Sequence, residues 1–115
     1  MQGLHLTGDL FDCGCSSATL TDLETLSTLC RTATLDAKLT IVDEKWHVFP
    51  DWNGQPGGIT GTILLAESHL AIHTWPESRG VTLDVYVCNF TEDNTAKAEQ
   101  LFDALTVAFR PQKQT

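Results

Sequence analysis

The residues best suited to chemistry lie in one short stretch, residues 66–77, which reads AESHLAIHTWPE. Ser68 follows a glutamate there, and His73 comes five residues later. A serine hydroxyl can be activated as a nucleophile, and histidine is a common proton-transfer group because its pKa lies near neutrality. Taken singly, such a serine is usually only a small polar residue, and such a histidine is usually hydrogen-bonded in a core. Only their joint spacing indicates a reaction.

Cysteines are a second possible source of chemistry, and the chain has four: Cys13, Cys15, Cys30 and Cys88. The first two are separated by a single residue, which is too close for a disulfide framework, and we expect a reducing compartment. A zinc site would need a second pair of ligands. His69 and His73 could form that pair only with non-standard spacing, so zinc binding is a remote alternative and we predict no metal site.

Length and charge restrict the class of protein. The chain has 115 residues, enough for one domain spanning 1–115, and a formal net charge of −8. Its basic residues are not clustered, so we expect no nucleic-acid partner. No apolar run approaches the roughly 20 residues of a membrane span, and the N-terminus lacks a signal-peptide pattern. These features predict a cytoplasmic protein with no membrane association. An acidic surface suits a cationic or amine ligand, although most such surfaces only confer solubility.

Hydrophobic periodicity indicates the elements that must position the reactive stretch. Alternation and short apolar runs predict strands at residues 4–11, 39–43 with an extension through 46–49, 62–66, 68–75 and 81–88. Thr21 and Glu24 have the form of a capping box, which predicts a helix after the first strand. Thr91 or Asp93 is the predicted cap of a last helix, whose apolar stripe ends at Phe109.

These elements predict an α+β fold. The order is β-α-β-β-β-β-α, and the short connections between neighbouring strands favour antiparallel pairing. An antiparallel sheet with two helices on one face is a two-layer sandwich. The other face would carry Phe11, Trp46 and Trp75, which are large for a surface in contact with water. We therefore expect a second subunit to cover that face.

With these elements in place, residues 67–77 (ESHLAIHTWPE) resemble the self-cleavage motif of the small prokaryotic S-adenosylmethionine decarboxylases. The resemblance covers nearly the whole chain, through GLHL at 3–6, WHVF at 46–49, GITG at 58–61 and DVYVC at 84–88. It implies a proenzyme that cuts itself between Glu67 and Ser68, which gives a β chain of residues 1–67 and an α chain of residues 68–115. It also implies a homodimer whose sites use residues of both protomers.

The residues themselves suit that reaction. Decarboxylating an amino acid leaves electrons on the α-carbon, and no side chain offers an electrophilic carbonyl to accept them. Ser68 Oγ would attack the Glu67 carbonyl to form an ester, and β-elimination with hydrolysis would leave a pyruvoyl group at residue 68. This cofactor would form a Schiff base with the substrate amine and act as the electron sink. His73 is the candidate base for elimination, and Thr60, where the family usually has serine, is the candidate donor to the oxyanion.

The resemblance also implies roles in binding and in protonation. Cys88 would protonate the α-carbon after carbon dioxide leaves. Phe49 would stack on adenine, and Glu77 would accept hydrogen bonds from the ribose hydroxyls. Leu70 and Trp75 are further substrate-binding candidates, and an aromatic ring stabilises a sulfonium by roughly 0.5–2 kcal/mol.

One segment departs from the family pattern. Residues 50–57 (PDWNGQPG) form an insertion directly after Phe49, rich in turn-forming residues. Three consequences stay open at this point: the insertion reshapes the rim of the pocket, extends the subunit contact, or does neither.

The predicted function is decarboxylation of S-adenosylmethionine to the aminopropyl donor for spermidine synthesis. A pyruvoyl-dependent arginine or ornithine decarboxylase on the same scaffold is the alternative, because those substrates also carry an α-amine and a distal cation. A regulatory or binding subunit that has kept the fold is a rival from another class. Such a subunit would stay uncut, whereas an active enzyme would give two fragments.

Overall fold

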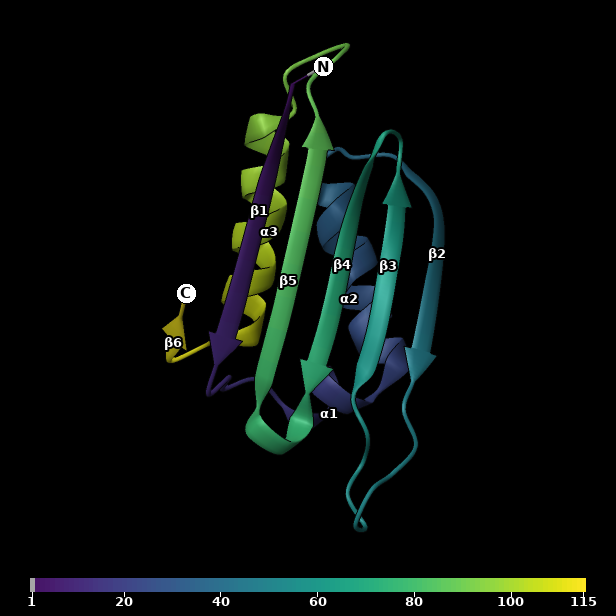
Figure 1. Cartoon of the computed structure of the whole chain (residues 1–115), viewed down its shortest axis with the longest axis vertical. Coiled ribbons are helices and arrows are strands. Elements are labelled where there is room, and N and C mark those ends of the chain that lie inside the picture. The colour runs from purple at the N-terminus through teal and green to yellow at the C-terminus, as the bar shows by residue number, and fades with distance from the viewer. Residues whose placement is uncertain (1) are drawn as a thin grey trace.

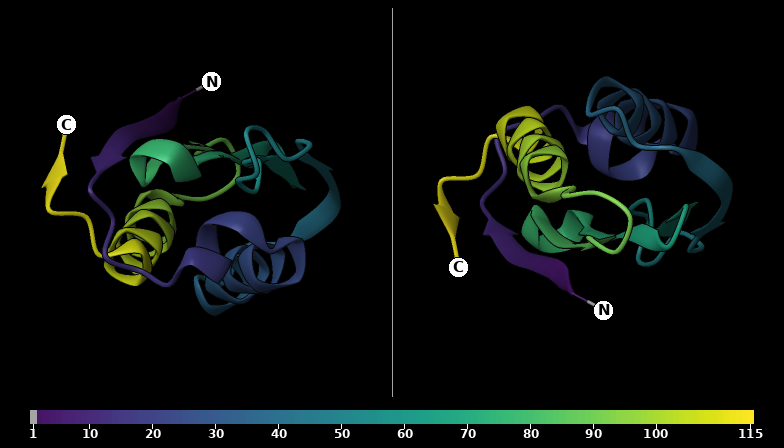
Figure 2. Two further views of the ribbon diagram at one scale, coloured as in Figure 1. Left: turned by 90° about the horizontal axis from the view of Figure 1, so that it is seen from below. Right: turned by 90° about the horizontal axis from the view of Figure 1, so that it is seen from above.

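The computed structural model describes residues 2–115 as one antiparallel sheet with helices on one face (Figures 1 and 2). Neighbouring strands follow the order β2-β3-β4-β5-β1-β6. The elements are β1 (Gly3–Phe11), α1 (Ser17–Thr21), α2 (Leu23–Asp36), β2 (Ile41–Val48), β3 (Ile59–Leu65), β4 (Ser68–Trp75), η1 (Pro76–Ser78), β5 (Gly80–Cys88), α3 (Thr95–Phe109) and β6 (Lys113–Gln114). The predicted α+β sandwich is confirmed. Met1, the first residue of the predicted domain, lies outside the described residues.

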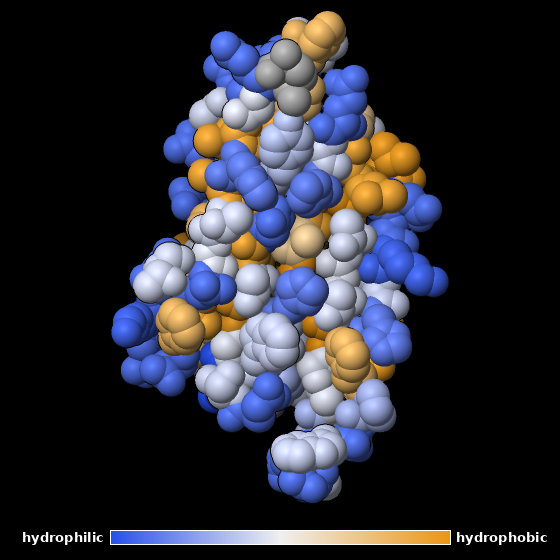
Figure 3. All heavy atoms as spheres, viewed as in Figure 1, coloured by the Kyte–Doolittle hydropathy of each residue, from blue (hydrophilic) through white to orange (hydrophobic). Residues whose placement is uncertain are grey.

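Alternation along the central strands separates a buried face from an open one. On β4, Leu70 and Ile72 are fully buried beneath the helices, whereas His69 and His73 are half-buried on the opposite face. Successive side chains of a strand point to opposite faces, so this pattern fixes which residues can form a site together. Figure 3 views the open face, where hydrophilic side chains and side chains of intermediate hydropathy cover much of the strands. Within residues 2–115, no helix is long and apolar enough to cross a membrane.

The start of α2 differs from the prediction. Its N-cap is Asp22, whose carboxylate accepts hydrogen bonds from the Thr25 backbone N–H at 3.0 Å and from the Thr25 hydroxyl at 2.6 Å. The predicted capping box of Thr21 with Glu24 is therefore wrong, because Thr21 ends the short helix α1 and donates to the Ser17 carbonyl. An aspartate satisfies the free N–H groups of a first turn as well as a threonine does.

The last helix also begins later than the predicted caps. The N-cap position of α3 is Asn94, and the helix starts at Thr95. Asp93 still supplies an acceptor, because its Oδ1 receives the Thr95 N–H at 2.9 Å. Thr91 does not occupy the cap. The two-residue strand β6, which pairs with the end of β1, and the five-residue α1 were not predicted.

Trp46 lies on the helix-covered face, which contradicts its expected place on the open face. Its ring packs against the core, and its Nε1 donates to Glu44 Oε1 at 2.8 Å. The ring also covers Gly61 on the neighbouring strand, where an added Cβ would come within 2.1 Å of a ring atom. Phe11 and Trp75 are exposed, as predicted. β3 begins at Ile59, earlier than predicted, so it includes Thr60.

Arg31 of α2 donates two hydrogen bonds, of 2.6 and 3.0 Å, to the Glu44 carboxylate of β2. These bonds lower the pKa of the Glu44 carboxyl despite its partial burial. We expect Glu44→Gln to lower the free energy of unfolding at pH 7 by no more than about 1 kcal/mol, because solvent screens the pair. A carboxyl with a depressed folded pKa contributes stability above its unfolded pKa and loses it as pH falls through the folded value.

Urea unfolding of both proteins at pH 7 and pH 3 measures this difference. The gap between wild type and Glu44→Gln should narrow at the lower pH. The control is Glu92→Gln. The Glu92 side chain pairs with Lys97 and is largely exposed, so this substitution should change the free energy of unfolding very little. An unchanged gap at pH 3 would show that the ionised carboxylate is not what stabilises this contact.

Candidate active site

The predicted site residues gather at opposite ends of the sheet. Ser68 is the first residue of β4 and Cys88 is the last residue of β5, so both lie at the end of the sheet that carries the β3–β4 turn (Figure 1). His73 lies near the far end of β4, opposite Thr60 of β3 in the strand register. We name these two groups the serine end and the histidine end.

At the serine end, the chain makes its tightest turn beside the predicted cleavage bond. Ala66 and Glu67 alone connect β3 to β4, and both are exposed. Glu67 has φ of 60°, a left-handed conformation that costs a residue with a side chain roughly 1–2 kcal/mol. The Ser68 hydroxyl oxygen accepts a hydrogen bond from the Cys88 backbone N–H at 3.1 Å. The peptide bond predicted to be cut is thus accessible, follows a strained residue, and lies beside a fixed hydroxyl.

A small polar cavity of 110 Å³ lies at the serine end, with both Ser68 and Cys88 on its wall. Alternation in the sequence places Cys88 on the polar face, but the residue is buried, with only 7% exposed. Asn94, at the start of α3, donates to the Cys88 carbonyl at 2.8 Å and holds this strand end in place. Two lysines, Lys38 and Lys97, and two glutamates, Glu67 and Glu92, also line the cavity, so charges of both signs lie around Ser68 and Cys88.

At the histidine end, Thr60 and His73 form a directly hydrogen-bonded pair. Thr60 Oγ1 lies 3.0 Å from His73 Nδ1, which follows from their opposite positions on adjacent strands. The imidazole also stacks on the Trp75 ring, with centroids 6.3 Å apart and an interplanar angle of 29°. The hydroxyl and the ring thus hold the histidine on the open face.

Three of the four predicted substrate-binding side chains line a cavity of 270 Å³ at the histidine end. Phe49, Trp75 and Glu77 line it together with Thr60 and His73. Its wall is mostly apolar, as a site for an aromatic base requires. Small-molecule sites usually occupy roughly 300–1,000 Å³, so this cavity is suited to part of a ligand rather than all of a nucleoside.

The insertion contributes directly to this cavity. Pro50, Trp52 and Gly57 form part of its wall, and Trp52 also borders a neighbouring cavity of 210 Å³. A Trp52–Gln55 bridge closes the tip of the loop, and a hydrogen bond from the Phe49 N–H to the Gly58 carbonyl closes its base. Of the three consequences left open by the sequence, the structure supports a reshaped pocket rim.

Two predicted residues do not reach the positions that their roles require within one chain. His73 follows Ser68 by five residues along β4, which is about 17 Å of strand, and alternation sets the two on opposite faces. His73 therefore cannot take a proton from Ser68 of the same chain. Leu70 is fully buried in the core, which contradicts a substrate contact through its side chain.

One cluster was not predicted as a unit. His5 of β1 and His69 of β4 both reach Asp84 of β5, at 2.7 and 3.0 Å from its Oδ1. Burial opposes ionisation of Asp84, but the two hydrogen bonds outweigh it and hold the pKa of this carboxyl below its usual value. Alternation in the sequence places all three on polar faces, but the strand order that joins them cannot be read from periodicity. The imagined zinc pair of His69 with His73 is wrong, since His69 groups instead with His5 and Asp84.

Comparison with known proteins agrees with this fold. Residues 4–115 match the family model described as S-adenosylmethionine decarboxylase. An S-adenosylmethionine decarboxylase proenzyme of Aquifex aeolicus is 35% identical over 96% of this chain and 74% of the relative. The namesake proenzyme of Pyrobaculum islandicum is 36% identical over 96% of this chain and 81% of the relative.

A solved structure gives the same result. The crystal structure of the adenosylmethionine decarboxylase from Aquifex aeolicus superposes with a TM-score of 0.81 at 33% identity, covering 98% of this chain and 84% of that one. The chain belongs to the S-adenosylmethionine decarboxylase family, and the resemblance found in the sequence is confirmed.

Proposed function

We propose that this chain is a pyruvoyl-dependent enzyme that decarboxylates S-adenosylmethionine and so forms the aminopropyl donor for spermidine synthesis. The observation that carries the proposal is the contact between the Ser68 hydroxyl and the Cys88 backbone, directly after the strained Glu67 turn. Relatives named as proenzymes of this decarboxylase support it. None of the relatives described above is an arginine or ornithine decarboxylase, so the comparisons do not favour that alternative.

The serine end fits a chain that processes itself. An exposed two-residue turn leaves room for Ser68 Oγ to approach the Glu67 carbonyl, and release of Glu67 would relieve its left-handed backbone. A pyruvoyl group at residue 68 supplies an electrophilic carbonyl that accepts the electrons released by decarboxylation. Cys88 shares the cavity with Ser68 and is placed to deliver a proton to a carbon bound there.

The separation of the two ends supports a homodimer whose active sites each combine two chains. At the serine end, the neighbouring imidazole of His69 is hydrogen-bonded to Asp84, and the histidine end lacks a nucleophile. A twofold axis across the strands, with the open sheet faces packed together, would bring the serine end of one protomer to the histidine end of its partner. Thr60 and His73, which lie on the open face, would then act on the partner's scissile bond.

The same arrangement completes a substrate site. The cavity with Phe49, Trp75 and Glu77 would hold the adenosyl part, with aromatic rings against the base and a carboxylate for the ribose hydroxyls. The amino acid part would extend to the serine end of the other protomer. This assignment accounts for a cavity that is small for a whole nucleoside substrate.

Thr60 provides a test of the processing step. Thr60→Val keeps the shape of the side chain but removes the hydroxyl that contacts His73. We expect self-cleavage to slow by about 100-fold or more, as for loss of one oxyanion donor. The time course of fragment formation on denaturing gels measures the rate. Thr60→Ser, which keeps the hydroxyl, is the control and should cleave at nearly the wild-type rate; a fast Thr60→Val variant would remove Thr60 from the mechanism.

Intact mass followed by a substrate panel tests the function as a whole. We expect two fragments that meet between residues 67 and 68, with the second blocked by a pyruvoyl group. We expect carbon dioxide only from carboxyl-labelled S-adenosylmethionine, and none from labelled arginine or ornithine. A chain that stays whole would indicate a binding or regulatory subunit instead. Four free, buried cysteines also fit the cytoplasm, which we propose as its location.

A further inference from the structure

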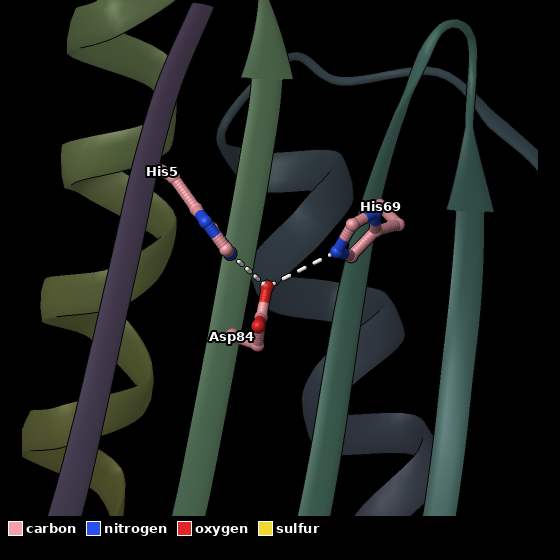
Figure 4. Close-up of side chains that lie close together, drawn as sticks. All are labelled: His5, His69 and Asp84. Carbon is pink, nitrogen blue, oxygen red and sulfur yellow. Dashed lines mark hydrogen bonds and ion pairs between the residues drawn. The ribbon is translucent and has the colours of Figure 1, made fainter.

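The open face of the sheet carries a group of three side chains whose ligand atoms converge on one point. His5, His69 and Asp84 lie on three adjacent strands (Figure 4). The two Nε2 atoms and the Asp84 carboxylate oxygen all lie within 4.8 Å of one another. Of the residues that the structure describes, these alone form such a group of three possible metal ligands.

Strand register explains why the two imidazoles are symmetric about the carboxylate. His5 and His69 are both paired with Tyr86, from opposite sides of β5, and Asp84 lies two residues along that strand on the same face. Paired strands are about 4.8 Å apart, so both rings start at similar distances from the central strand and lean inward. Their centroids are 6.3 Å apart and their planes nearly perpendicular, at 79°, so both edges face Asp84 without stacking.

We propose that His5, His69 and Asp84 form a binding site for a divalent first-row transition ion such as Zn²⁺ or Co²⁺. Two imidazole nitrogens and one carboxylate oxygen are a donor set that suits Zn²⁺, Co²⁺, Ni²⁺ or Fe²⁺, whereas Mg²⁺ and Ca²⁺ prefer oxygen ligands. The ion would take the place of the shared hydrogen bonds. In the single protomer, His5 is 52% exposed and His69 is 38% exposed, which leaves coordination positions for water. In the proposed homodimer this face is the subunit contact, so the ion would lie between the two sheets.

The setting favours binding over a transient contact. All three ligands are held by strands rather than by loops, so little order has to be gained when an ion binds. His69 and Asp84 lie on internal strands, and His5 lies on β1, which forms the edge of the sheet at that residue. The site does not include Ser68, His73 or Cys88, so metal binding can be tested independently of the proposed decarboxylase activity.

Titration of the metal-free full-length chain with Co²⁺ tests the site. We expect one ion per chain, a visible absorption band typical of bound Co²⁺, and displacement of that ion by Zn²⁺. Asp84→Asn and His69→Gln should each weaken binding by about 100-fold or more, since loss of a ligand exceeds the 10–100-fold cost of losing an outer-shell partner. His5→Gln, near the chain end, is a third variant if either of the first two folds poorly by circular dichroism.

His47→Gln is the matched control, because His47 is exposed on β2 and lies outside the cluster. It should bind Co²⁺ as the wild type does. Zn²⁺ should also raise the midpoint of thermal unfolding for wild type and His47→Gln, and not for His69→Gln. The proposal is overturned if wild type binds no ion, or if His47→Gln and His69→Gln weaken binding equally.

Discussion

Ser68→Ala will leave the full chain of 115 residues uncut and will release no carbon dioxide from S-adenosylmethionine. Alanine has no oxygen to attack the Glu67 carbonyl, so neither the ester nor the pyruvoyl group can form. The fold should survive, since the one hydrogen bond lost comes from the backbone N–H of Cys88, and water at the polar cavity can replace it. Intact mass and labelled carbon dioxide release measure the two effects.

Ser16→Ala is the control for this change. Ser16 is exposed at the start of α1, where its hydroxyl contacts only Thr19, and the substitution should leave cleavage and activity as in wild type. A Ser68→Ala chain that folds and still decarboxylates at the wild-type rate would exclude a pyruvoyl group made from Ser68, and with it the proposed function.

His73→Ala and Ser68→Ala chains, each uncut when produced alone, will restore cleavage to each other when produced together. Because the two residues of one chain are about 17 Å apart along β4, we expect His73 to act on a partner's Ser68. With equal amounts and random pairing, about half of the His73→Ala chains should be cut, since each mixed dimer contains one complete site. Mass spectrometry of the mixture identifies which chain is cut.

In the matched control, the His73→Ala chain is produced together with a chain that carries both Ser68→Ala and His73→Ala. This doubly substituted chain has the same fold and the same alanine at residue 68 as the Ser68→Ala chain, but it has no imidazole at residue 73. The His73→Ala chain should therefore stay uncut. Cutting of His73→Ala chains alone at the wild-type rate would remove His73 from processing. Rescue by the doubly substituted chain would show that association, rather than the imidazole, restores the reaction.

The sequence was most informative where periodicity and local spacing decide the structure. Alternation over residues 68–75 correctly predicted β4 and its two faces, because one face is buried by helices. The extent of β3 was harder to predict, since Gly61 interrupts the pattern and its role is to accommodate the Trp46 ring. Trp46 itself was misplaced because a tryptophan suits either face, and its contacts with the core and with Gly61 appear only once β2 pairs with β3.

For the site, the sequence named the residues but not their grouping. Thr60 and His73 meet because β3 and β4 form a hairpin, a register that single-chain spacing only suggests. The cluster around Asp84 depends on β1 pairing with β5, which joins residues 79 apart in the sequence, and no local pattern reports so distant a contact. Leu70 was predicted to bind substrate because of its place in the motif. Its apolar side chain already indicated the core, because residues two apart on a strand share a face and Ile72 is buried.

The short turn between β3 and β4 has a consequence for maturation. Once the backbone opens there, each product keeps one strand of the former hairpin, and β4 stays hydrogen-bonded between β3 and β5. The pieces therefore remain interlocked without any covalent link. A mature molecule that is denatured must recover its shape by an encounter between two separate peptides, so its renaturation should depend on dilution, whereas that of the precursor protomer should not.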